Sequence, residues 1–191
     1  RSNESLKILH DKGSLKDYFS SKVSTSVNSL NITYMNSMES LSFDKGGYQM
    51  SLVGPDNFVI EDCSTQRNLN QQGIDQSISI GQEFSKRDIP IQQVYSSQWC
   101  RCKDTASYAF GDYQELSSLN STFEGKFRQN HPRQIKELKE LIARWDDTEG
   151  NLILVTHYVI VGGALGYYPS SGELVITDKS LKVLGSIKTK Y

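Results

Sequence analysis

The chain has 191 residues, of which 37% are hydrophobic and 23% charged, which is typical of one folded α/β domain with a substantial core. Its net charge of −1 lacks the basic excess that nucleic-acid grooves and membrane-surface patches require, so we expect no nucleic-acid partner. No apolar run reaches the ~20 residues that cross a bilayer, so we expect no membrane span.

The chain contains three cysteines, Cys63, Cys100 and Cys102. They are too few for a disulfide scaffold, and no further ligands stand at the spacing of a zinc site. We therefore expect neither a metal nor a cofactor. One pair can form a single disulfide if the compartment is oxidising, which leaves one thiol over.

The N-terminal part of the chain predicts little regular structure before residue 35. A helix is predicted over Tyr34–Leu41 from apolar residues at three- and four-residue steps, and it ends at Gly46-Gly47. Tyr48–Val53 is predicted as the first strand. Gly54-Pro55-Asp56-Asn57 is a turn cluster that ends this strand.

The middle of the chain predicts a helix, a strand and a second helix. Leu69–Phe84 has helical periodicity with Asn70 as its N-cap, and a strand begins at Val94 and enters a turn at Ser96-Ser97. Arg101 follows that turn at the start of a helical segment. Backbone N–H groups and a guanidinium at such a point form a good anion site, although a lone Arg at a helix start is more often simply solvated.

The second half alternates helices and strands after an irregular segment, residues 113–130, that we interpret as an insertion or active-site loop. Asn151–Thr156 is a nearly continuous apolar run, which is typical of a central strand covered on both faces. The alternation predicts a three-layer α/β/α sandwich around a mostly parallel sheet. The other predicted elements are a helix from His131-Pro132, a helix over Val159–Leu165, and strands at Leu174–Ile176 and Leu181–Leu184.

Arg101 and His157 each follow the C-terminal end of a predicted strand. Ligand sites of open α/β sheets form outside these strand ends. An Arg and a His that meet there can bind and stabilise a phosphoryl group.

From about residue 36 to the C-terminus, the sequence resembles the histidine phosphatase superfamily, which has the phosphoglycerate-mutase-like fold. It is most similar to a bacterial branch carried on secreted or periplasmic proteins. The resemblance implies a histidine-phosphatase-like domain over residues 36–191, an N-terminal extension over residues 1–35, and a periplasmic or secreted location. The matching segments are Gly46–Tyr48, Asp62–Asn70 with Gly73, Tyr95–Ala106, Val155–His157 and Pro169–Glu173.

In active members of this family a histidine attacks the phosphate ester, next to an arginine at the end of the first strand. A second arginine and a second histidine hold the phosphoryl oxygens. By position, Arg101 and His157 match this second pair, as the retained members of the catalytic and phosphate-binding site. Val53 and Gly54 stand where the first Arg-His pair is expected, and neither can act as a nucleophile or bind an anion through its side chain.

Other residues are weaker candidates for the site. His10 lies far upstream of the first predicted strand, and His131 precedes Pro132 at a helix start, where a surface role is expected. Arg67 either contributes to the anion site or braces its own loop, and the two interpretations are equally supported. Cys63 and Arg67 have only three residues between them, so the thiol-phosphatase mechanism, which needs five, is rejected.

The resemblance also places Cys63 and Cys100 at the same rim of the sheet, which implies a disulfide between them in an oxidising compartment. The alternative is three buried free thiols. Cys102 is the less suitable partner, because it enters the helix that begins near Arg101.

Our leading hypothesis is a catalytically inactive or impaired pseudophosphatase that acts as a binding or regulatory module. It would bind phosphate or a small anion weakly, and more tightly as the pH falls through about 6.5, the ordinary pKa of histidine. Two alternatives remain open. One is an active phosphomonoesterase with a recruited nucleophile, and the other is a protein-interaction domain with a vestigial pocket and a protein partner.

Overall fold

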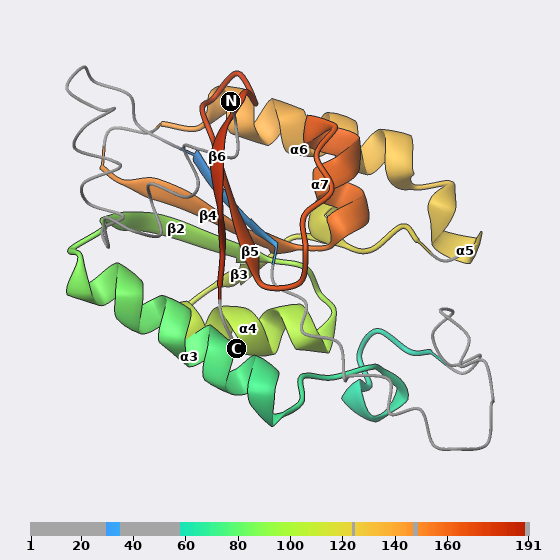
Figure 1. The fold of residues 1–191 in the computed structure, drawn as a ribbon. Helices are drawn as coiled ribbons and strands as arrows, with labels where there is room; N and C mark the ends of the chain where they lie inside the picture. Colours follow the sequence, from blue (N-terminus) through green and yellow to red (C-terminus); the bar gives the residue numbers. More distant parts are fainter. Residues whose placement is uncertain (1–29, 35–57, 124, 147–148, 190–191) are drawn as a thin grey trace.

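The computed structural model describes residues 30–34, 58–123, 125–146 and 149–189, which form a six-stranded sheet with helices on both faces (Figure 1). Strands β3, β2, β4 and β1 are parallel neighbours, and β5 and β6 complete the sheet in antiparallel pairing. The predicted mixed α/β fold with a mostly parallel sheet is confirmed. In sheet order the strands are β3 (Gln114–Glu115), β2 (Ile91–Ser96), β4 (Asn151–Thr156), β1 (Leu30–Tyr34), β5 (Glu173–Thr177) and β6 (Val183–Lys188).

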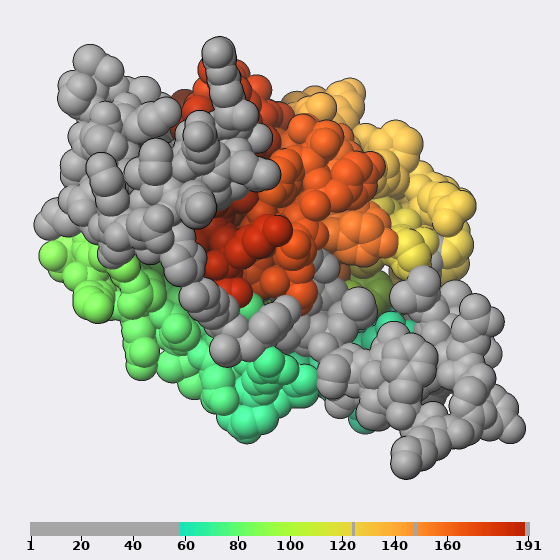
Figure 2. All heavy atoms as spheres, in the orientation of Figure 1, coloured from blue at the N-terminus to red at the C-terminus, as the bar shows by residue number. Residues whose placement is uncertain are grey.

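The helices form two layers that enclose the sheet, as Figure 1 shows. Helices α3 (Gln71–Lys86) and α4 (Cys100–Phe110) cover one face. Helices α6 (His131–Arg144) and α7 (Tyr158–Leu165) cover the other. The space-filling view shows α6 and α7, in orange, against the yellow segment near residue 125, which includes α5 (Gly125–Arg128) (Figure 2). The short 3-10 helices η1 (Cys63–Thr65) and η2 (Ser117–Leu119) lie in connecting loops.

Strand β4 lies at the centre of the core, and its side chains point alternately toward the two helix layers. Leu152 and Leu154 pack in the apolar cluster with residues of α6 and α7. Ile153 and Val155 pack in the cluster with residues of α3 and α4. All four side chains are buried, which confirms the predicted central strand.

The sequence predicts no strand at residues 30–34, where the structure has β1. The structure inserts Leu30–Tyr34 between β4 and β5, with Tyr34 opposite Thr156. Tyr34 therefore belongs to a strand, and the helix predicted from it is wrong at its first residue. Pairing with two neighbours supplies the backbone hydrogen bonds of this segment, and such long-range contacts are invisible to helical periodicity. The predicted strand Tyr48–Val53 lies outside the described residues.

Strand β6 and the segment at residues 113–130 also differ from the prediction. Strand β6 begins at Val183 rather than at Leu181, because the preceding turn is longer than expected. Asp178 Oδ1 accepts hydrogen bonds from the Ser180 hydroxyl and the Lys182 N–H, and Leu181 has a φ of 65° inside that turn. The interpreted loop at residues 113–130 contains β3, η2 and α5.

In the described part of the chain, no helix has the length and apolar character to span a membrane.

Candidate anion site

The candidate site lies where the neighbouring parallel strands β2 and β4 end. Strand β2 leads through Ser97 to α4, which carries Arg101 in its first turn, and β4 leads to His157, the N-cap residue of α7. The Ser97 N–H donates to Val155 O at 2.9 Å, which holds the two strand ends together. The sheet therefore brings Arg101 and His157 to one carboxyl edge, as the sequence predicts.

Arg101 and His157 contact each other directly. Arg101 Nη2 lies 3.1 Å from His157 Nδ1, and the two residues are only 8% and 1% exposed. The indole of Trp99 contacts both residues. Its ring centroid lies 4.5 Å from Arg101 Cζ and 5.3 Å from the imidazole centroid, so the guanidinium is held by a cation–π contact as well as by the hydrogen bond.

The contact determines the protonation state of His157. A guanidinium only donates hydrogen bonds, so Nδ1 must accept and the proton of the neutral imidazole lies on Nε2. Burial, and then the charge of Arg101, hold the pKa of His157 well below its usual value of 6.5. The pKa of His157 in the ligand-free protein therefore lies below the value on which the expected pH dependence of binding is based, because the sequence cannot show an enclosed imidazole beside a guanidinium. The pH dependence of binding itself stays a prediction.

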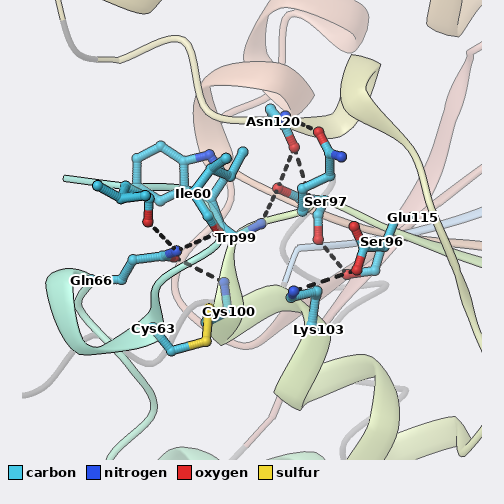
Figure 3. Close-up of polar contacts among 12 residues, drawn as sticks. Ile60, Cys63, Gln66, Ser96, Ser97, Trp99, Cys100, Lys103, Glu115 and Asn120 are labelled. Carbon is cyan, nitrogen blue, oxygen red and sulfur yellow. Dashed lines mark hydrogen bonds and ion pairs between the residues drawn. A yellow bond between two sulfur atoms is a disulfide. The ribbon is translucent and has the colours of Figure 1, made fainter.

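Ser97 lies against the imidazole, and Asn120 lies against Ser97. Ser97 Oγ lies 3.0 Å from His157 Nε2 and 3.0 Å from Asn120 Oδ1, and Figure 3 shows the Ser97–Asn120 contact. The Cys102 sulfur is 3.6 Å from Nε2, and burial raises the pKa of this thiol to about 11. Sequence reasoning missed Asn120, because the irregular segment at residues 113–130 carries no periodic signal that would place one side chain.

A disulfide between Cys63 and Cys100 joins the loop around η1 to the first residue of α4 (Figure 3). This is the pairing that the family resemblance implied, and Cys102 is free and buried. Gln66 reinforces the junction. Its Oε1 accepts from the Cys100 N–H at 3.0 Å, and its Nε2 donates to Ile60 O at 2.9 Å. The loop is therefore fixed to the helix start that carries Arg101.

Arg67 lies on this fixed loop and is half-buried. It stands between Gln66 and Asn68, and Asn68 Nδ2 donates to Cys63 O at 2.7 Å. The loop geometry supports a bracing role for these neighbours. A role for Arg67 in anion binding stays a prediction.

Of the remaining predicted residues, the structure describes only His131. His10, Val53 and Gly54 lie outside the described residues. His131 Nδ1 lies 2.6 Å from Thr122 Oγ1 at the start of α6, so this histidine has a local hydrogen-bond partner, as a structural role requires.

An aromatic cluster adjoins the site on the side of the η1 loop. Phe58 stacks on Trp99 with ring centroids 4.3 Å apart, and Phe127 of α5 contacts both rings edge-on. Lys126 Nζ lies 5.1 Å from the centroid of Phe127 and 5.4 Å from that of Phe58. The cluster supports Trp99 and, through it, the position of Arg101.

Comparison with known proteins gives the fold. No family model matches the chain, and no curated protein matches it. A phosphoglycerate mutase from Thermus thermophilus superposes with a TM-score of 0.51 at 16% identity, over 85% of this chain and 99% of that one. Rv3214 from Mycobacterium tuberculosis superposes with 0.51 at 13% identity, over 78% and 89%. The protein histidine phosphatase SixA, complexed with tungstate, has a TM-score of 0.48 at 11% identity, over 85% and 95%. The first two superpositions show that the chain has the phosphoglycerate-mutase-like fold.

Proposed function

We propose that this protein is a pseudophosphatase of the histidine phosphatase superfamily that binds a phosphate group or another small anion at Arg101 and His157 without hydrolysing it. The observation that carries the proposal is the buried contact between these two side chains at the carboxyl edge of the sheet. A cation enclosed at that edge, and stacked on an indole, is oriented before a ligand arrives.

The same contact defines what binding requires. His157 Nδ1 accepts from Arg101 in the described structure, so it has no proton to offer an anion. An anion that contacts both residues must draw the guanidinium away from Nδ1, and Nδ1 must gain a proton. The negative charge of the ligand favours that proton, so we expect binding to be accompanied by proton uptake.

The absence of turnover follows from the residues at the first-strand position. The family resemblance aligns Val53 and Gly54 with the Arg-His pair. Strand β1 is a second candidate for the first strand of the family, and in sequence it is followed by Met35 and Asn36. Neither alternative supplies a histidine or an arginine. Loss of a covalent nucleophile costs several orders of magnitude in rate.

The affinity should be weak, because only one arginine of the family's pair is matched. Each charge-assisted hydrogen bond contributes about 1.5–3 kcal/mol, and opening the Arg101–His157 contact opposes binding. We expect dissociation constants in the millimolar to high-micromolar range.

The test is a calorimetric or NMR titration of the protein with phosphate and with vanadate. Arg101→Ala should abolish binding, because it removes the buried guanidinium. Arg133→Ala is the matched control, since Arg133 is exposed on α6 and pairs with Glu137 at 2.8 Å. Equal binding by Arg101→Ala and the parent protein would refute the anion site and favour the protein-interaction alternative.

The competing enzyme hypothesis is tested in the same preparation. We expect negligible hydrolysis of an aryl phosphate and no acid-labile phosphohistidine. Robust turnover that disappears in His10→Ala would instead establish an active phosphomonoesterase with a recruited nucleophile.

The disulfide supports a further part of the proposal, the location of the protein. A bond between Cys63, which is exposed, and Cys100 persists in an oxidising compartment. It favours the periplasmic or secreted location of the bacterial branch that the sequence resembles.

A further inference from the structure

We infer that Ser97 and Asn120 are a positioning pair for His157, which keeps the imidazole proton on Nε2 and directs Nδ1 toward Arg101 and the anion. The statement about the anion rests on the proposed function, whereas the statement about the tautomer does not. Neither residue is part of the Arg101–His157 pair itself, and each acts through the imidazole.

The hydrogen-bond directions along this chain of groups are determined by chemistry. Arg101 can only donate to Nδ1, so Nε2–H donates to Ser97 Oγ at 3.0 Å. The Ser97 hydroxyl then donates to Asn120 Oδ1, also at 3.0 Å. Each contact in the series from Arg101 to Asn120 thus has one donor and one acceptor.

The orientation of the Asn120 amide is determined independently. The backbone N–H of Gln98 donates to Asn120 Oδ1 at 2.8 Å, so this atom must be the oxygen. Asn120 Nδ2 donates to Gln98 Oε1 at 2.8 Å. Asn120 therefore presents an acceptor, and only an acceptor, to the Ser97 hydroxyl.

Asn120 is also held rigidly with respect to β4. Thr156, the residue before His157, donates through Oγ1 to Leu119 O at 2.7 Å. Gln134 of α6 donates through Nε2 to Asn120 O at 2.9 Å and to Ser117 O at 3.0 Å. The loop that carries Asn120 is thus bonded to the strand end that carries the imidazole, which is the arrangement a positioning group requires.

The pair becomes important when His157 gains its second proton. The imidazolium keeps Nε2–H on Ser97 Oγ, so the oxygen dipole stabilises the new charge while Nδ1–H meets the anion. Among the described residues, the charged or titratable side chains that contact the imidazole are Arg101, which opposes protonation, and Cys102. Removal of the Ser97 hydroxyl should therefore weaken anion binding and move its pH dependence downward.

The experiment compares Ser97→Ala with Ser96→Ala, a matched control. Ser96 is equally buried, and its hydroxyl donates to the backbone oxygen of Ser97 at 2.9 Å and not to the imidazole. With inorganic phosphate as probe, Ser97→Ala should bind at least about tenfold more weakly, with a pH midpoint about one unit lower. Ser97→Thr, which keeps the hydroxyl, should bind phosphate with the affinity and the pH midpoint of the parent. Asn120→Ala should show a smaller loss of affinity and a smaller shift of the midpoint than Ser97→Ala.

The ligand-free protein supplies a second measurement, ¹⁵N NMR of labelled histidine. His157 should show the Nε2–H tautomer, with slow proton exchange in the parent and Ser96→Ala and faster exchange in Ser97→Ala. If Ser97→Ala fails to fold, the same acceleration is expected in Asn120→Ala.

Two results would overturn the inference: an Nδ1–H tautomer in the parent, or the same behaviour in Ser97→Ala and Ser96→Ala. Absence of phosphate binding by the parent would refute the proposed function alone, because the tautomer and its exchange rate are still measured.

Discussion

At the scale of single residues, His157 is an imidazole that the fold keeps neutral. It is almost completely enclosed, contacts a guanidinium through Nδ1 and donates through Nε2 to a serine hydroxyl. Burial and the Arg101 charge both lower the pKa of His157. The same residue that would help to hold an anion is therefore a source of acid sensitivity for the ligand-free protein.

The pH dependence of stability has a definite sign. Unfolded His157 binds a proton near its ordinary pKa of about 6.5, whereas the folded residue binds one only at lower pH. The free energy of unfolding should therefore fall as the pH drops below about 6.5, by up to about 1.4 kcal/mol per pH unit. Chemical denaturation between pH 7 and pH 5 measures this slope.

His157→Gln should reduce that slope, and His131→Gln is the control, because it replaces a histidine at the start of α6 that lies outside the Arg101–His157 contact. An equal slope in the parent and in His157→Gln would show that other groups govern acid sensitivity. Burial raises the pKa of Glu173, but hydrogen bonds from Ser186, Tyr167 and the Ser170 N–H outweigh it and hold this pKa below the usual 4.5. Glu173 therefore adds to the loss of stability only toward the acid end of this range, and it does so equally in the parent and in His157→Gln.

At the scale of elements, the start of α4 is the point at which several segments converge. The disulfide and Gln66 attach the η1 loop to Cys100, and Phe58, which precedes that loop, stacks on Trp99. Trp99 in turn contacts the Arg101 guanidinium. The disulfide thus stabilises the region that holds the cation.

Loss of the disulfide should destabilise the protein and weaken anion binding. The bond closes a loop with a sequence separation of 37 residues. Chain entropy for a loop of this length predicts a loss of about 3–4 kcal/mol in the double variant Cys63→Ser, Cys100→Ser. Urea denaturation measures it.

A dithiol reductant should destabilise the parent by a similar amount and leave the double variant unaffected, which separates loss of the bond from the serine substitutions. A double variant as stable as the parent would show that the disulfide does not support this region.

At the scale of the whole molecule, the two apolar clusters share one strand. Leu152 and Leu154 belong to the cluster beside α6 and α7, and Ile153 and Val155 belong to the one beside α3 and α4. Because β4 contributes to both, neither layer can keep its packing when this strand is lost. We therefore expect the described domain to unfold as one unit.

Leu154→Ala tests this coupling. The side chain is fully buried, so truncation should cost about 2–5 kcal/mol. Trp145, packed against the first cluster, and Trp99, the N-cap residue of α4 at the carboxyl edge of the sheet, report on two separate regions by fluorescence when the other is replaced by Phe. Both should give one midpoint in urea, and separate midpoints would contradict a single cooperative unit.

The sequence alone determined the elements whose signals are local. The apolar run of β4, the periodicity of α6 and the periodicity of α3 with its Asn70 cap matched the structure within a few residues, because they depend on burial pattern and on a local cap. Arg101 and His157 could be paired from the sequence, since the C-terminal ends of parallel strands meet at one edge.

Only the tertiary structure decided which segment fills the strand position beside β4, because β1 is defined by partners more than 100 residues away in sequence, such as Tyr34 and Thr156. It also decided the protonation of His157 and the part played by Asn120. Both depend on burial and on contacts between distant segments, and no local pattern of residues carries that information.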